Sequence, residues 1–206
     1  MRKLLAFIIV IFLILVGCTK PTPLLFPVLS SGGESVQTNV YIDYRFSEPE
    51  ETSITNALKS WECSLNYKIR FKIHYDTHYE YFEAADKKDL FIWKVDSKNE
   101  HIIEADKKLE QGDDRTDRFV VGLFLIGTKH PSVILLRMDR IGTDDIWTIS
   151  IHEIGHFLGL GHSDDKNSVM YRFTDIGSNK ITELDIKNVC SIYRFNYSDM
   201  KVCNIK

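Results

Sequence analysis

The chain has 206 residues, of which 44% are hydrophobic and 27% charged, and its formal charge is −3 at pH 7. This length and composition fit a single globular domain with a sizeable core. A mildly acidic chain without a basic cluster argues against nucleic acid as a partner.

Residues 1–17 have the composition of an export signal. Arg2 and Lys3 give a short basic start, and the sequence from Leu4 to Val16 is unbroken apolar. A bilayer-spanning helix takes about 20 apolar residues, so this run is too short to span and suits a signal-peptide core. We therefore expect residues 1–17 to lie outside the fold.

The apolar run ends in Leu15-Val16-Gly17-Cys18, which looks like a bacterial lipobox. In that interpretation Cys18 receives the lipid and becomes the first residue of the mature chain. The alternative is cleavage elsewhere, with Cys18 incidental. The lipobox predicts a protein exported to the bacterial cell envelope and anchored to a membrane, at the outer membrane or the cell surface.

Residues 18–38 are predicted to be a tether between the lipid and the domain. Three of the chain's five prolines fall here, together with the flexible run of residues 30–33. Such a segment is part stiff and part flexible. It leaves no room for a folded prodomain, so we expect no built-in inhibitory segment.

The globular domain is predicted over residues 39–206, with an α+β order of elements. Alternating or continuous apolar β-formers predict strands over residues 40–46, 69–75, 90–95, 118–126 and 132–138. Helical spacing and capping signals predict helices over residues 49–62, 143–158 and 182–193. The polar residues 80–89 predict an excursion or a short helix.

The segment His152–His162 reads H-E-x-x-H-x-x-G-x-x-H. Residues four apart on a helix share a face, so His152 and His156 can bind one ion. Gly159 can end the helix and turn the chain, which returns His162 as a third nitrogen ligand. Three protein ligands leave a tetrahedral Zn²⁺ with one open position, the pattern of a catalytic site.

Glu153 follows the first ligand and points off the ligand face. It can reach a zinc-bound water without binding the metal, and so act as general base. Met170 follows within the turn Asn167–Tyr171. Alone, Met170 would be read as an ordinary core methionine.

A three-histidine motif followed by a methionine turn is the metzincin signature, and the form here resembles the matrixin family, the matrix-metalloproteinase-like proteins. The order of elements is similar over about residues 39–195, although only residues 152–171 are specific. The resemblance implies a twisted, mostly parallel sheet with an edge strand over the cleft, a zinc-binding helix, a Met-turn and a C-terminal helix. It implies zinc ligands His152, His156 and His162, the base Glu153 and the Met-turn residue Met170.

The resemblance also implies a reaction, hydrolysis of a protein or peptide substrate by an activated water. The peptide would add a strand to an exposed sheet edge. We expect residues 132–138 to be that edge strand, the alternative being a plain core strand. We expect one catalytic zinc per chain and a monomer.

Several features depart from the family pattern. The spacing of the other histidines, His74, His78, His101 and His130, does not match the second zinc site of many matrixins. Calcium could bind near Asp113, Asp114 and Asp117, but a solvated acidic loop explains these residues as well. Arg172 stands where matrixins often have proline, so the loop 172–180, which shapes specificity in the family, leaves substrate preference open.

With Cys18 lipidated, three cysteines remain in an exported, disulfide-permissive chain. We expect Cys190 to pair with Cys203, which would fasten the tail to the last helix. A bridge from Cys63 to Cys203 is an alternative, and a thiol ligand to the zinc is a remote third.

Two non-enzymatic classes compete with the protease interpretation. One is a catalytically silent zinc-binding surface module that binds a protein partner, and the other is an envelope protein with a purely structural zinc. Structural sites usually have four protein ligands, mostly Cys. Three histidines with an intact Glu153 favour an enzyme.

Overall fold

The computed structural model describes residues 34–86, 88–112, 120–127, 130–172 and 180–206. As predicted, it is an α+β fold built on one five-stranded sheet, in the order β2-β1-β3-β5-β4, in which only β4 is antiparallel to its neighbour. Within the described ranges no helix combines the length and apolarity needed to span a membrane. The strands and helices are β1 (Val36–Asp43), α1 (Glu48–Ser64), β2 (Ile69–Thr77), β3 (Leu90–Val95), α2 (Glu100–Gly112), β4 (Gly122–Leu125), β5 (Ser132–Arg137), α3 (Ile146–Phe157) and α4 (Glu183–Tyr193).

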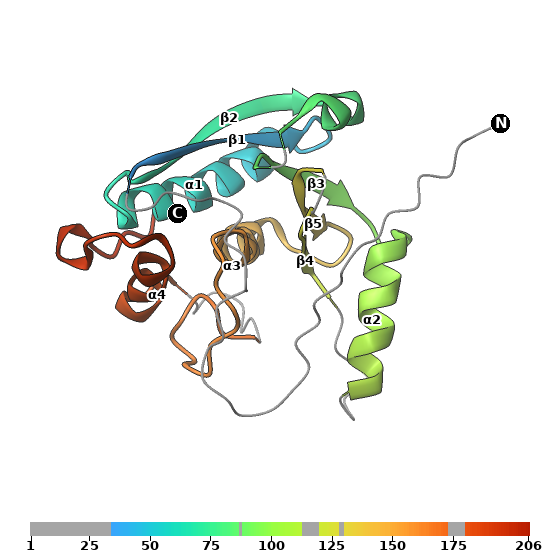
Figure 1. Ribbon diagram of the computed structural model, residues 1–206. Coiled ribbons are helices and arrows are strands. Elements are labelled where there is room, and N and C mark those ends of the chain that lie inside the picture. The colour runs from blue at the N-terminus through green and yellow to red at the C-terminus, as the bar shows by residue number, and fades with distance from the viewer. Residues whose placement is uncertain (1–33, 87, 113–119, 128–129, 173–179) are drawn as a thin grey trace.

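The core lies between one face of the sheet and the helices α1 and α3, which Figure 1 shows on the same side. Strand residues alternate between faces, so every second side chain of β1, β3 and β5 enters this layer. From α1, Ile54, Leu58 and Trp61 are fully buried. The Trp61 indole N–H donates to the Ile151 carbonyl at 2.9 Å, which fixes α1 against α3.

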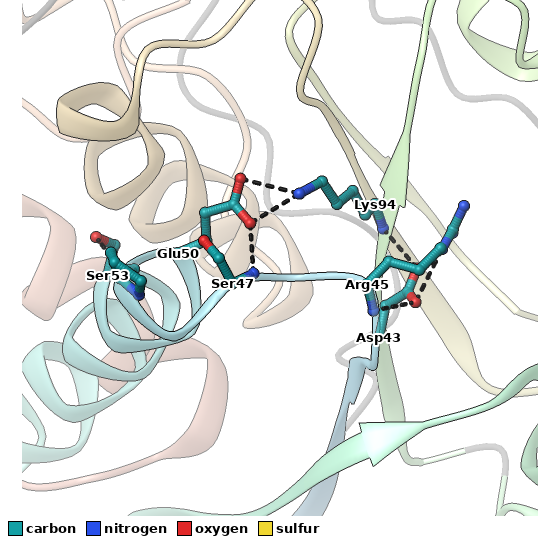
Figure 2. A network of polar contacts seen from close by, with 7 residues as sticks. Asp43, Arg45, Ser47, Glu50, Ser53 and Lys94 are labelled. Carbon is teal, nitrogen blue, oxygen red and sulfur yellow. Dashed lines mark hydrogen bonds and ion pairs between the residues drawn. The ribbon is translucent and has the colours of Figure 1, made fainter.

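A polar network joins the end of β1 to β3 and to the start of α1 (Figure 2). The buried Asp43 carboxylate accepts from the Lys94 backbone N–H at 3.0 Å and pairs with the Arg45 guanidinium. Glu50 accepts from the Ser47 backbone N–H at 2.6 Å and pairs with the Lys94 ammonium at 2.8 Å. A buried carboxylate needs such partners, so the network sets the point where the chain leaves the sheet and begins α1.

Most predicted elements are confirmed, and their ends shift by a few residues. The first strand begins at Val36, before the predicted domain start at Asn39. The polar stretch after β2 contains a short 3₁₀ helix, Tyr79–Ala84. The helix predicted over residues 143–158 consists of a 3₁₀ turn, Thr143–Asp145, followed by α3. The predicted signal peptide, Cys18 and most of the predicted tether lie outside the described residues.

The predicted edge strand is wrong. β5, at residues 132–137, lies inside the sheet between β3 and β4, and β4 forms the edge. Only a short connection separates β4 from β5, so β4 folds back as an antiparallel hairpin partner and takes the outer position. The edge position also explains why β4, which lies within the buried strand predicted over residues 118–126, is only half-buried.

Helix α2 was missed by the sequence interpretation, although it carries a signal. The Asn99 side-chain oxygen accepts from the backbone N–H groups of His101 and Ile102, at 3.1 and 3.4 Å, in the manner of an N-cap. Ile102 and Ala105 follow at helical spacing and are buried. Figure 1 shows α2 apart from α1 and α3, beyond β3, β5 and β4.

The predicted Cys190–Cys203 disulfide is also wrong, because Cys203 pairs with Cys63 and Cys190 is a buried free thiol. The C-terminal tail runs along α1 rather than α4. Ser64 Oγ accepts from the Cys203 backbone N–H at 3.0 Å, and Ser60 Oγ accepts from the Ile205 N–H at 2.8 Å. These contacts bring Cys203 to Cys63 at the end of α1.

We expect loss of this bridge to be costly, since it closes a loop with a sequence separation of 140. Chain-entropy arguments give about 2–5 kcal/mol for such a bridge. Cys63→Ala with Cys203→Ala should lower the unfolding free energy by this amount in non-reducing urea, and reductant should bring wild type to the variant's level. A non-reducing peptide map that joins Cys190 to Cys203 would contradict the pairing.

Candidate metal centre

Three histidine rings converge on one point beside α3. His152, His156 and His162 each offer one ring nitrogen, and these nitrogens all lie within 4.8 Å of one another. The Nε2 atoms of His156 and His162 are 3.2 Å apart. His152 and His156 come from successive turns of α3, as the spacing predicted. The three histidines form the only group of potential metal ligands in the part of the chain that the structure describes.

The third histidine returns through a turn at Gly159. Its φ is +92°, a region that side chains with a Cβ rarely adopt, so glycine is required here. The N–H groups of Gly159 and Leu160 donate to the carbonyls of His156 and Gly155, at 2.9 and 3.0 Å. These bonds close the end of α3 and direct the chain back, which places His162 beside the other two rings.

Backbone carbonyls fix the tautomer of two of these rings. His152 Nδ1–H donates to the Val169 carbonyl at 2.7 Å, and His156 Nδ1–H donates to the Leu160 carbonyl at 2.8 Å. Since a carbonyl only accepts, Nδ1 carries the proton and Nε2 keeps its lone pair. Burial lowers the pKa of all three histidines, to about 3 for His162. The triad is therefore neutral, as metal ligands must be.

Glu153 lies beneath the edge strand rather than in the ligand set. The side chain is only 6% exposed, and burial raises the pKa of its carboxyl to about 8, while a backbone hydrogen bond from Phe124 in β4 opposes this rise. A carboxyl with a pKa near neutrality, next to a triad but separate from it, has the properties of a general acid–base group.

The segment after the triad packs against α3 at Met170, the residue predicted to form the Met-turn. Met170 is buried, and its carbonyl accepts from the Ser163 N–H at 2.7 Å. A Cβ on Gly155 would lie 2.3 Å from the Met170 sulfur. Gly155 thus allows Met170 to pack directly against the helix that carries His152 and His156.

Asp185 of α4 is a residue that the sequence interpretation left without a site role. Its buried carboxylate accepts from Ser168 Oγ at 2.6 Å and from the Thr182 N–H and hydroxyl at 2.9 and 2.8 Å. Burial raises its pKa, and a hydrogen bond from the Val169 backbone is among the contacts that lower it. Val169 also accepts from His152, so Asp185 supports the ligand through the turn.

We expect Asp185→Ala to lower the unfolding free energy by about 3 kcal/mol or more, since several buried donors lose their acceptor. Glu183→Ala is the matched control, because Glu183 is an exposed acid in the same first turn. Urea unfolding of both variants measures the difference. Equal stability of the two variants would refute the supporting role.

The buried carboxyl also predicts a pH dependence for the chelated, metal-free protein. The ordinary pKa of Glu153 is 4.5 and its folded pKa is about 8. Between these values the folded state binds one proton more than the unfolded state, so stability falls as pH rises towards 8. The three histidines act in the opposite direction. Because their pKa values are lowered from the ordinary 6.5, their contribution to the stability of the protein is lost as the pH falls below 6.5.

Just above pH 6.5 the unfolded histidines are still partly protonated, so the contribution of Glu153 is the difference in slope between wild type and Glu153→Gln. We expect the unfolding free energy of wild type to fall more steeply than that of Glu153→Gln between pH 6.5 and 8, by up to about 1.4 kcal/mol per pH unit. Denaturant unfolding at a series of pH values in chelator measures it. The same slope in both proteins would contradict the assignment.

Of the remaining predicted residues, those that the structure describes are not part of the three-histidine group. His74 stacks on Tyr41 and His78 stacks on Tyr44, with ring centroids 4.7 and 4.1 Å apart. Arg172 is exposed, and its charge helps to lower the pKa of His162. Cys18, the acidic residues Asp113, Asp114 and Asp117, and residues 173–179 of the specificity loop lie outside the described residues.

The comparisons with known proteins agree with this geometry. The family model described as Matrixin matches residues 44–194. Metalloendoproteinase 2-MMP of Arabidopsis thaliana is 39% identical over 54 residues, which cover 25% of this chain and 14% of that protein. Matrix metalloproteinase-A of Caenorhabditis elegans is 36% identical over 55 residues, covering 27% and 11%. Human matrix metalloproteinase-15 is 32% identical over 53 residues, covering 24% and 8%. The matches thus span less than a fifth of each relative's length.

Proposed function

The chain belongs to the matrixin family, and from this premise we propose that it is a zinc-dependent endopeptidase. The observation that carries the proposal is the convergence of His152, His156 and His162 beside the buried Glu153. Three neutral imidazoles with a separate carboxyl form the open, catalytic pattern of a zinc site rather than the closed, structural one.

The donor set fits zinc in chemistry, and one of its nitrogen pairs also fits zinc in distance. Zinc–nitrogen bonds of about 2.0–2.1 Å in a tetrahedron place ligand nitrogens about 3.3 Å apart. The Nε2 atoms of His156 and His162 are 3.2 Å apart. His152 and His156 also have the backbone hydrogen bonds on Nδ1 that orient metal-binding rings.

In the proposed reaction, bound zinc supplies Lewis acidity, which acidifies a water and polarises the scissile carbonyl. The Glu153 carboxylate takes the proton of the attacking water at one of its oxygens. It then delivers this proton to the nitrogen of the leaving amine. Burial of Glu153 favours the first of these steps, because a raised pKa makes the carboxylate a stronger base.

We propose that the substrate is a protein or peptide bound as an extended strand along the open edge of β4. This edge replaces the residues 132–138 expected from sequence. β4 is the last strand of the sheet and lies over α3. Phe124 of β4 packs against Phe157 of α3, with ring centroids 6.2 Å apart. A strand added there would pass beside the triad.

A mixed fluorogenic peptide library tests the proposal, with the cleavage points read by mass spectrometry and the zinc content determined. Internal cleavage by the full-length, zinc-loaded chain supports an endopeptidase. Bound zinc with no cleavage of any library member would overturn that proposal and favour the silent zinc-binding module.

We further propose that the protein is held in a bacterial cell envelope by a lipid on Cys18, at the outer membrane or surface, and acts there as a monomer. The support is the sequence Leu15-Val16-Gly17-Cys18 after an apolar run. β1 begins at Val36. A tether from Cys18 to Val36 would allow the domain to reach about 60 Å from the membrane at most.

Metabolic labelling with an alkyne fatty acid tests the anchor. The wild-type chain should take up the label and sediment with membranes. Cys18→Ser should lose both properties. A wild-type chain that carries no label would refute lipidation at Cys18.

A further inference from the structure

The backbone of β4 presents alternate residues to the open edge of the sheet. The Arg137 N–H donates to the Val121 carbonyl at 3.0 Å, and the register continues through Gly122 opposite Leu136. Antiparallel pairs alternate between hydrogen-bonded and non-bonded positions. The N–H and carbonyl groups of Gly122 and Phe124 therefore point away from β5, towards the open edge.

The face of β4 that lies over α3 has room for no side chain at Gly122. A Cβ built there would lie 2.6 Å from Glu153 Oε1, 2.9 Å from Glu153 Cγ and 2.7 Å from Ile149 Cγ2. All three distances are shorter than real Cβ contacts. The φ of Gly122 is not positive, so backbone conformation does not explain the glycine. Its reason is steric, because the Glu153 carboxyl occupies the space.

Phe124, two residues along β4 from Gly122, contacts the same carboxyl. A backbone hydrogen bond joins Phe124 to Glu153, and the Phe124 ring is fixed against Phe157 of α3. The carboxyl thus has a gap above it at Gly122 and a donor beside it at Phe124. A side chain at residue 122 would displace the carboxyl from this donor.

We infer that Gly122 is a positioning residue for the general base: its missing side chain creates the space in which Glu153 is held beneath the substrate edge. This inference rests on the proposed function for its kinetic consequence. The packing of Gly122 against Glu153 can be tested without any activity. A failure of this inference can therefore be distinguished from a failure of the proposed function.

The first test is a double-mutant cycle on thermal unfolding of the full-length chain in chelator and detergent. Gly122→Ala should lower the melting temperature more in the presence of Glu153 than in the Glu153→Ala background. The contact with Ile149 is common to both backgrounds and cancels. Gly142→Ala is the matched control, since its Cβ would meet only Asp145 Oδ2, at 3.2 Å. It should lower the melting temperature by the same amount in both backgrounds. Equal losses for Gly122→Ala would overturn the inference.

The second test is kinetic and uses the zinc-loaded chain. Gly122→Ala should lower kcat by about 10- to 100-fold, as expected for a misplaced catalytic group, with KM and zinc content unchanged. Glu153→Asp has a shorter side chain and removes the closest of the three contacts, that with Oε1. Adding Gly122→Ala to Glu153→Asp should therefore cost much less than adding it to wild type.

Equal costs in the two backgrounds, or an effect on KM alone, would refute the positioning role. If zinc-loaded wild type cleaves no peptide, the proposed function fails. The unfolding cycle then still decides whether Gly122 makes room for Glu153.

Discussion

Replacing Glu153 by Ala is expected to lower kcat by about 10²–10⁴-fold, the usual contribution of a general base, while the chain keeps its zinc. Glu153 is buried next to the triad but separate from its three nitrogens, so its loss should remove proton transfer and spare metal binding. Hydrolysis of a fluorogenic peptide, with zinc determined on the same samples, measures both quantities.

Glu104→Ala is the control for this substitution, because Glu104 is an exposed acid on α2 that pairs with Lys108. It should leave kcat, KM and zinc content at the wild-type values. If Glu153→Ala cleaves as fast as wild type, another group supplies the base and the role assigned to Glu153 is wrong. If it loses zinc as well, Glu153 contributes to the metal centre.

Replacing His156 by Ala is expected to abolish both zinc binding and hydrolysis. Loss of an outer hydrogen-bond partner of a metal ligand typically costs about 10–100-fold in affinity, so loss of a ligand should exceed 100-fold. The ring of His156 is close to both other ligands, with centroids 4.7 Å from His152 and 4.8 Å from His162. Competition with a chromophoric chelator measures the zinc affinity.

His101→Ala is the matched control, since His101 lies on α2, where its ring is near Glu100. It should bind zinc and cleave peptides as wild type does. Retention of tight zinc binding by His156→Ala would show that the ion is held elsewhere, outside the triad.

The centre was the most predictable part of the molecule, because its information is local. His152 and His156 are one helical turn apart, and Gly159 is close enough to return His162 within the same short segment. A period of 3.6 residues and one glycine turn therefore define the geometry. The helices α1 and α4 were predictable for the same reason, from capping signals and apolar spacing.

Strand order was not predictable in this way. The continuous apolar run within residues 132–137 indicates that both faces of the strand are buried, but it does not show how many neighbours the strand has. The hairpin between β4 and β5 decided this, and it placed the edge at β4. The disulfide failed for a similar reason, since the tail's contacts with Ser60 and Ser64 arise from tertiary packing.

The supporting residues of the centre were missed because they act over long sequence distances. Asp185 reaches the turn that holds His152 through Ser168, and Gly122 meets Glu153 across two elements. From sequence Asp185 is recognisable only as part of the capping box that begins α4, and Gly122 belongs to no motif. A buried Asp or a strand glycine has many structural explanations.

The central claim is that one zinc ion in the three-histidine centre drives peptide hydrolysis. The most direct measurement is a zinc titration of the chelated, full-length chain, with peptide cleavage followed at each addition. We predict no cleavage without zinc, a linear rise in rate with added zinc, and a plateau at one zinc per chain. Cleavage that is independent of zinc, or a folded chain that binds none, would contradict it.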